Sequence, residues 1–215
     1  EGNAMKIKTL AKSYDEVMAI KPPKYFKPMK TNIFWQTLTM AISKVALISS
    51  GFTHRKVGME KLGKNEPALI LMNHSCFLDL KIAFRIFFPR RFMIVCTTDA
   101  LIGKNLLMRL LGCIPTNKFV TDIPLVSDII YSIKKLKTSV LMYPEAGYSF
   151  DGRATAIPEN LGVLIKKLGV PVVTVITEGA FLHDPLYNGL QHRKVKVTAN
   201  VKCLVSAEET AAMSA

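Results

Sequence analysis

The chain has 215 residues and a mass of 23.9 kDa, which is the size of one ordinary domain with a sizeable core. Hydrophobic residues make up 49% of the sequence and charged residues 21%, and this globular composition excludes disorder as a description of the whole chain. A formal net charge of +13 combined with a mean hydropathy of +0.24 favours a protein of the anionic membrane surface over a nucleic-acid binder.

Residues 1–52 form a basic arm followed by an apolar segment. Early prolines interrupt the arm and predict a short helix over 8–19, followed by an extended linker. Residues 33–52 approach the length of about 20 residues that spans a bilayer, but Lys44 lies near their middle. An interfacial helix with Trp35 at the headgroup level and a core-packed helix are therefore both open, and a membrane span is the least favoured of the three.

From residue 67 onward, apolar strands alternate with amphipathic helices. Strands are predicted over residues 67–72, 92–98, 139–143, 172–177 and 194–204, and helices over 77–88, over 104–112, and onward from 124 and from 158. The last strand alternates strictly between apolar and polar residues, so we expect it at an edge of the sheet. The pattern indicates an α/β fold over 53–215, with a layered, mixed and largely parallel sheet flanked by helices, preceded by an N-terminal helical membrane-associating segment.

Cysteine usage and the two ends bear on the environment of the chain. The four cysteines include no C-x-x-C pair, which argues against a zinc site, and three lie in apolar runs as reduced core residues do. We therefore expect a cytosolic-side environment. No signal peptide is predicted, because the start is polar and no suitable apolar run follows within 30 residues. The ending SAEETAAMSA is typical of a helix cut short, so we expect the natural chain to extend beyond it.

The first candidate for chemistry is NHSCFLD, which contains His74 and, five residues later, Asp79. His74 follows a buried strand at a strand-to-helix junction, where α/β proteins place their sites. An imidazole that takes a proton from an alcohol needs a carboxylate on its other nitrogen. Five positions on a regular helix are about 140° apart, so the two side chains meet only if His74 lies before the first turn. The residues alone also allow a structural capping role.

The second candidate is the segment YPEAGYSFDGR, residues 143–153, which again follows a strand. It is rich in turn residues and carries Glu145, Asp151 and Arg153. It can be a solvated surface connection. It can also be a substrate loop in which Glu145 positions hydroxyl groups and a cation holds phosphate.

NHSCFLD, YPEAGYS about 70 residues later and VPVVTV after that resemble the glycerolipid acyltransferase family, over roughly residues 57–178. The best-known members are 1-acyl-glycerol-3-phosphate acyltransferases. The resemblance implies that His74 and Asp79 form the catalytic dyad of the N-H-x-x-x-x-D motif. It also implies that Asn73 and Pro144 support the two motifs.

The same resemblance implies where substrate binds, and it also shows departures from the family pattern. The family block F-P-E-G-T-R-S corresponds to residues 143–149, so Tyr148 stands where the family has an acceptor-binding Arg. Lys118 takes the position of a second such Arg, and Arg153 is expected to compensate for the first. The substrate-binding residues expected on these grounds are Lys118, Glu145, Gly147, Tyr148 and Arg153.

The function implied by the resemblance is transfer of a fatty acyl group from a thioester of coenzyme A or acyl carrier protein to a lysophospholipid hydroxyl. The first candidate acceptor is 1-acyl-glycerol-3-phosphate, in phospholipid biosynthesis. No cofactor or metal is expected. The expected partners are acyl-CoA or acyl carrier protein, a lysophospholipid and an anionic membrane surface, without nucleic acid. The expected location is the cytoplasmic face of the cell membrane, peripheral or monotopic.

Mechanistically, His74 is expected to act as the general base in direct transfer, with amide donors near the start of the helix stabilising the oxyanion. A covalent route through Ser75 or Cys76 is less favoured. Two other functions remain open, a non-catalytic lipid-binding homologue and a thioesterase with water in place of the alcohol.

Overall fold

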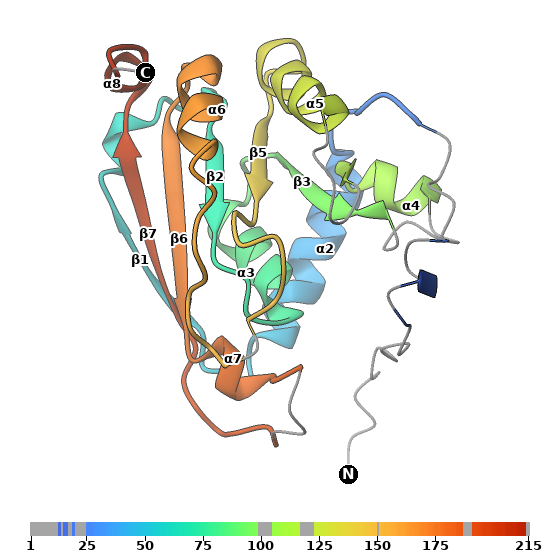
Figure 1. Ribbon diagram of the computed structural model, residues 1–215. Coiled ribbons are helices and arrows are strands. Elements are labelled where there is room, and N and C mark those ends of the chain that lie inside the picture. The colour runs from blue at the N-terminus through green and yellow to red at the C-terminus, as the bar shows by residue number, and fades with distance from the viewer. Residues whose placement is uncertain are drawn as a thin grey trace.

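The computed structural model describes residues 13, 15–16, 19, 25–98, 105–116, 123–149, 151–186 and 191–213. These residues form one seven-stranded sheet with helices on both faces (Figure 1). The predicted α/β architecture is confirmed. The helix predicted over 8–19 and the candidate residue Lys118 lie largely or wholly outside the described residues.

The sheet is mixed and largely parallel, with the strand order β1-β7-β6-β2-β5-β3-β4. All neighbouring strands are parallel except β6 and β7. The strands are β1 (Thr53–Val57), β2 (Leu69–Met72), β3 (Phe92–Thr97), β4 (Cys113–Thr116), β5 (Ser139–Met142), β6 (Val172–Glu178) and β7 (Thr198–Val205). The central strand β2, LILM, is buried along its whole length, as expected for a parallel strand covered on both faces.

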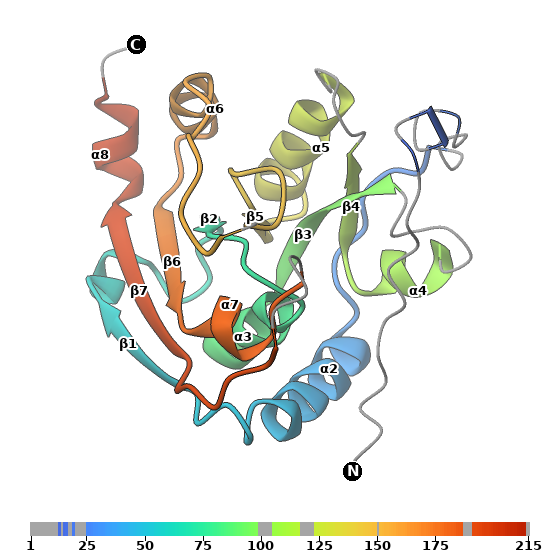
Figure 2. The same ribbon diagram turned by 60° about the horizontal axis from the view of Figure 1, so that its bottom comes forward.

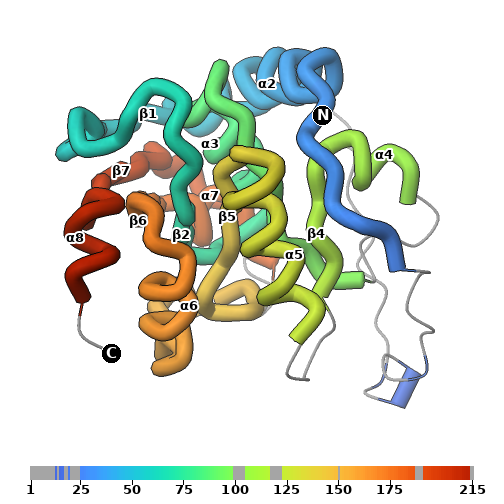
Figure 3. The backbone as a smooth tube through the Cα atoms, turned by 90° about the horizontal axis from the view of Figure 1, so that it is seen from above, coloured from blue at the N-terminus to red at the C-terminus, as the bar shows by residue number. Residues whose placement is uncertain are grey.

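Two helical layers cover the sheet, as the view from above shows (Figure 3). Helices α2 (Ile33–Ala46) and α3 (Leu78–Phe87) lie on one face, and α5 (Ile123–Lys134) and α6 (Leu161–Leu168) on the other. Alternation along β2 divides the core accordingly, because Ile70 belongs to the cluster that contains the α3 side chains and Leu69 to the cluster under α5 and α6. The shorter helices are η1 (Met59–Lys61), α4 (Asn105–Leu110), α7 (Ala180–His183) and α8 (Ala207–Ala211).

The expectation that the last strand lies at the edge is wrong. β7 alternates in burial as predicted, but it pairs with β6 on one side and with β1 on the other (Figure 2). The true edge strand is β1, whose sequence THRKV is exposed at every position and shows no apolar alternation. The opposite edge is β4, CIPT, and its Pro115 is compatible with an edge because proline cannot donate to a further strand.

The predicted helices are largely in place. The helix predicted over 77–88 is Leu78–Phe87, and the helix expected from residue 158 begins at Leu161. Among the described residues, no helix is both long enough and apolar enough to cross a bilayer.

The two buried side chains of helix α2 are polar, and several of its large apolar side chains are exposed. Its buried residues are Gln36, whose Nε2 donates to the carbonyl of Arg90 at 2.9 Å, and Ser43, whose hydroxyl donates to the carbonyl of Thr39 at 2.6 Å. The large apolar residues exposed on α2 and the following turn are Ile33, Phe34, Leu38, Ile42, Val45 and Ile48. We call these six residues the apolar stripe. This arrangement differs from that of a plain core helix, which buries its apolar face.

Two glycines with a left-handed backbone, Gly112 and Gly169, allow a test of the contact between Gly112 and Thr31 in the N-terminal segment. Gly112 has φ 79° and Gly169 has φ 58°, so alanine is strained at both. A Cβ at Gly112 would also overlap the hydroxyl of Thr31, which is held by donation to the carbonyl of Phe92 at 2.6 Å, whereas a Cβ at Gly169 meets nothing within 4 Å. We expect Gly169→Ala to cost about 1 kcal/mol of unfolding free energy and Gly112→Ala about 2–3 kcal/mol, measured by urea denaturation. Equal costs would contradict the contact with Thr31.

Candidate active site

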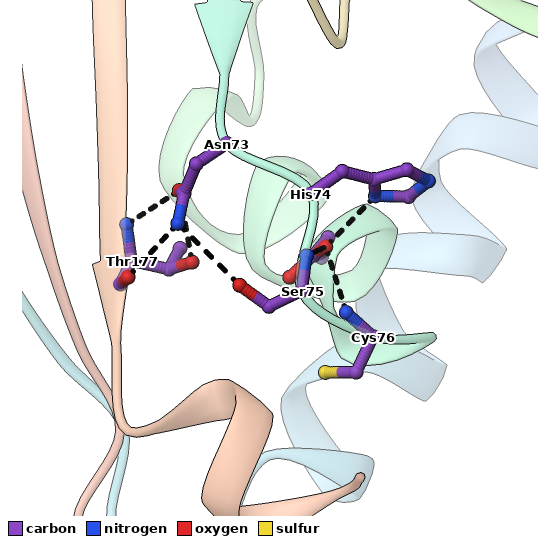
Figure 4. Close-up of polar contacts among 6 residues, drawn as sticks. Asn73, His74, Ser75, Cys76 and Thr177 are labelled. Carbon is purple, nitrogen blue, oxygen red and sulfur yellow. Dashed lines mark hydrogen bonds and ion pairs between the residues drawn. The ribbon is translucent and has the colours of Figure 1, made fainter. Parts of the chain in front are cut away.

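A hydrogen-bonded clamp fixes the chain where β2 ends. The Asn73 side-chain oxygen accepts from the backbone amide of Thr177 at 2.8 Å and from its hydroxyl at 3.0 Å, and Asn73 Nδ2 donates to the Thr177 carbonyl at 3.1 Å (Figure 4). The side chain of Asn73 thereby continues the pairing of β2 with β6 beyond the last residue of β2. The side chain of the next residue, His74, points away from Thr177 (Figure 4).

The predicted dyad is assembled in the structure. His74 Nδ1 lies 2.9 Å from Asp79 Oδ2, and the Asp79 side chain is fully buried while that of His74 is 15% exposed. Helix α3 begins only at Leu78, so His74 lies before the first turn, as the five-residue spacing requires. Because Oδ2 acts as an acceptor, Nδ1 carries the proton, and the neutral imidazole keeps its lone pair on Nε2.

The carboxylate of Asp79 has a second role at the start of the helix. Its Oδ2 also accepts from the backbone amides of Ser75 at 2.6 Å and Cys76 at 3.0 Å (Figure 4). The capping role and the orienting role, which the sequence left as alternatives, therefore belong to the same oxygen. These two amides are engaged by Asp79, so the expectation that amides at this point serve the oxyanion is wrong for Ser75 and Cys76.

The thiol beside His74 is unsuited to a covalent mechanism. Cys76 is 1% exposed. Burial raises the pKa of its thiol far above the ordinary value, and the nearby Asp79 raises it further. Since the thiolate is the nucleophilic form, the environment argues against Cys76 as an acyl carrier.

Two tyrosine rings enclose the imidazole. The ring centroids of Tyr143 and Tyr148 lie 3.7 Å and 3.8 Å from that of His74, at interplanar angles of 14° and 30°. Burial raises the pKa of Tyr143 well above its ordinary value, with further contributions from Asp79 and Tyr148, so its ring remains neutral near pH 7. With the stacked rings covering His74 and Asp79 on Nδ1, the ring edge that carries Nε2 is the part of the imidazole left for a further contact by these three residues.

The loop 143–153 is joined to the dyad through its backbone. The amide of Ser149 donates to the carbonyl of His74 at 2.9 Å, and the buried Ser149 hydroxyl accepts from the amide of Gly152 at 2.8 Å. Burial raises the pKa of the half-buried Glu145, while backbone hydrogen bonds from Thr155 and His74 lower it. Glu145 therefore contacts the backbone of the dyad segment, and the loop is part of the site.

Two other predicted substrate residues, Arg153 and Gly147, are exposed. The Arg153 side chain is 89% exposed, and its Nε lies 3.7 Å from Asp151 Oδ2. Gly147 is exposed, with open space where a side chain would begin. Gly152, with φ 82°, packs so closely on Phe181 of α7 that no Cβ would fit, which limits movement of the loop at this point.

Three residues that contribute to the site were not predicted as site residues from the sequence. Thr177 lies at the far end of a different strand, Tyr143 occupies a position that is aromatic in the family motif, and Ser149 acts through its amide. Only the strand order, which places β6 beside β2, brings Thr177 to Asn73. Among the described residues, no three or more His, Cys, Asp or Glu side chains are grouped to hold a metal ion.

Comparison with known proteins agrees with this geometry. A protein-family model described as Acyltransferase matches residues 54–178, more than half of the chain, and the chain therefore belongs to the acyltransferase family. Among solved structures, the crystal structure of the 1-acyl-sn-glycerophosphate (LPA) acyltransferase PlsC from Thermotoga maritima is similar in fold, with a TM-score of 0.61. The two are 17% identical, over 84% of this chain and 71% of that chain. No curated protein matches the sequence significantly. The family resemblance deduced from the two motifs is confirmed.

A strained residue in the loop allows a stability test. Ala146 stands where the family motif has glycine and adopts φ 55°, which costs an L-amino acid about 1–2 kcal/mol. Ala146→Gly removes this strain but gives the unfolded chain more freedom, so we expect a net stabilisation of about 0.5–1 kcal/mol. The neighbouring change Gly147→Ala meets open space and should alter stability by less than about 0.5 kcal/mol. Destabilisation by Ala146→Gly in urea denaturation would contradict the left-handed conformation.

Proposed function

We propose that the protein transfers a fatty acyl group from an acyl thioester of coenzyme A or acyl carrier protein to the free hydroxyl of a lysophospholipid. The observation that carries this proposal is the 2.9 Å contact between His74 Nδ1 and the buried Asp79, which leaves Nε2 as the base. The proposal is supported by membership of the acyltransferase family and by the resemblance of the motifs to those of glycerolipid acyltransferases.

In the proposed reaction, Nε2 of His74 accepts the proton of the acceptor hydroxyl as its oxygen attacks the thioester carbonyl. A new ester C–O bond forms, and the C–S bond of the tetrahedral intermediate breaks. The thiolate leaves with the proton that His74 returns to it. The contribution of Asp79 is to hold the ring in one orientation and to favour the transient imidazolium, because its carboxylate stays on Nδ1 throughout.

The acceptor proposed first is 1-acyl-glycerol-3-phosphate, and the site has an aromatic ring where the family has a cation. Tyr148 stacks on His74 and forms an edge contact with Phe77, with centroids 5.5 Å apart. An aromatic ring contributes no charge to a phosphate. Phosphate recognition would therefore depend on other cations, and we propose Lys118 and Arg153 for this role.

The dyad is tested by single substitutions. We expect His74→Ala to lower kcat by roughly 10²–10⁴-fold while the fold persists, because Asp79 keeps both of its amide donors. Asp79→Asn should lose nearly as much, since it retains an oxygen for the amides but no longer holds Nδ1–H in the same way. The measurement is thiol release from acyl-CoA with lysophosphatidate present, accompanied by detection of the diacyl product.

The matched control is His54→Ala, which removes an exposed histidine from edge strand β1. It should retain wild-type kinetics. A folded His74→Ala protein with activity within tenfold of wild type would exclude the dyad. Thiol release that is independent of any lipid acceptor would identify a thioesterase, and the absence of release with a range of acceptors would favour a non-catalytic lipid-binding homologue.

We also propose that the protein associates with an anionic, cytosol-facing membrane through its N-terminal segment. The apolar stripe supports this proposal, because Ile33, Val45 and Ile48 are each more than 60% exposed and an apolar face of this kind is typical of an interfacial helix. The net charge of +13 adds attraction to anionic headgroups.

The stripe is tested with the double variant Leu38→Gln/Ile42→Gln. Both side chains are exposed, at 40% and 56%, so stability should change by less than about 1 kcal/mol. Binding to anionic vesicles at high salt, where charge attraction is screened, should fall by at least tenfold. The control Val163→Gln removes an apolar residue of α6 that is more exposed, at 69%, and should bind as wild type does. Equal vesicle binding by all three proteins in sedimentation would exclude the stripe.

A further inference from the structure

A second concave site lies at the amino ends of three parallel strands, whereas His74 follows the carboxyl end of β2. A cavity of about 380 Å³ is lined by residues that precede or begin three parallel strands, namely Pro67 before β2, Arg91 before β3 and Ser139 at the start of β5. The cavity lies at the amino end of β2 and His74 follows its carboxyl end, so the four residues of that strand separate them. The cavity is therefore distinct from the dyad.

The lining of this cavity is strongly basic. Its charged residues are five cations and one anion, Lys30, Lys64, Arg90, Arg91, Lys137 and Glu66. Across the described part of the chain, the side-chain nitrogens of Lys30, Lys64, Arg91 and Lys137 have no hydrogen bond or ion pair. Four uncompensated cations around one concavity repel each other in the empty protein. Their mutual repulsion is relieved when an anion of more than one charge binds between them.

The fifth cation gives the cavity a rigid wall. Arg90 Nη1 donates to the carbonyl of Glu66 at 2.6 Å and Nη2 to the carbonyl of Gly63 at 2.8 Å. The Glu66 carboxylate in turn accepts from the amide of Gly63 at 2.9 Å. Both charged groups are thus hydrogen-bonded to the backbone of the segment 63–66, whereas the four other cations that line the cavity have no such partner among the described residues.

Lys137 provides a second, independent observation. It adopts φ 49° in the turn between α5 and β5, a strained conformation for an L-amino acid that glycine or asparagine adopts more readily. Strained residues of this kind cluster at ligand sites. The strained residue here is a lysine that lines the basic cavity.

We propose that this cavity binds a phosphomonoester dianion. The site goes beyond acyl transfer, since it shares no residue with the dyad or with the loop 143–153. Four unpaired cations that line one cavity favour a compact dianion over a singly charged phosphodiester. Ile33 lines the cavity and is also the first residue of the apolar stripe, so the headgroup of a lipid whose chains lie along α2 is the ligand source that the geometry favours.

The test combines binding with stability. Lys137→Asn removes one cation and relieves the backbone strain, and Arg91→Gln removes another. We expect each to weaken binding of dihexanoyl phosphatidate monomers, measured by titration calorimetry, by roughly tenfold. The control Lys166→Gln on α6 makes the same change in net charge and should alter binding by less than twofold. Lys137→Asn should also keep or raise the melting temperature, so its weaker binding cannot result from unfolding.

Two further titrations identify the source of the phosphate. Weaker sedimentation of the two variants with phosphatidylcholine vesicles that contain phosphatidate, relative to the Lys166→Gln protein, supports the lipid headgroup. Weaker binding of inorganic phosphate alone, with vesicle binding unchanged, supports the site with a soluble phosphate as its ligand. If Lys137→Asn and Arg91→Gln bind every ligand as the Lys166→Gln control does, the proposal is overturned. None of these readouts depends on acyl transfer, so they remain informative if the proposed activity is not found.

Discussion

One buried oxygen organises the site of this protein. Asp79 Oδ2 accepts hydrogen bonds from His74 Nδ1 and from the amides of Ser75 and Cys76, and a buried carboxylate needs such donors to remain charged. The three contacts hold the segment between β2 and α3 in a tight turn outside the helix. That turn gives the imidazole its position, and the Asn73–Thr177 clamp holds the turn to the sheet. The same carboxylate oxygen therefore fixes both the start of the helix and the position of the imidazole.

The sequence contained the local part of this arrangement. The apolar periods located β2 and α3, and the five-residue spacing required His74 to lie before the helix, where it does lie. The parts that could not be predicted depend on strand order. β1 has no apolar alternation because its residues are exposed, so nothing marked it as the edge strand that displaces β7 from that position. Thr177 meets Asn73 only because β6 lies beside β2. The stack of Tyr148 on His74 likewise requires β5 beside β2, and no spacing predicts it.

The two ends of the parallel strands carry different properties. At the carboxyl ends, one buried carboxylate, one imidazole and two tyrosines form a compact site. At the amino ends, unpaired cations surround a cavity. Helix α2 begins at the basic end and extends beside α3, with Gln36 and Ser43 buried. The side chain of Gln36 binds the domain through a hydrogen bond to the carbonyl of Arg90, while Phe34 is exposed.

The way the loop 143–153 is attached affects how the family can diversify. The amide of Ser149 donates a hydrogen bond to the carbonyl of His74, and a backbone amide is the same in every residue type except proline. Gly152 and the buried Ser149 hydroxyl are held by their own contacts, but an exposed position of the loop such as Gly147 can change without loosening the junction with His74. A gene that keeps the dyad can therefore accumulate changes at such positions at low cost to folding, and each change alters the surface beside the imidazole. That surface is in this sense more evolvable than the contact between His74 and Asp79.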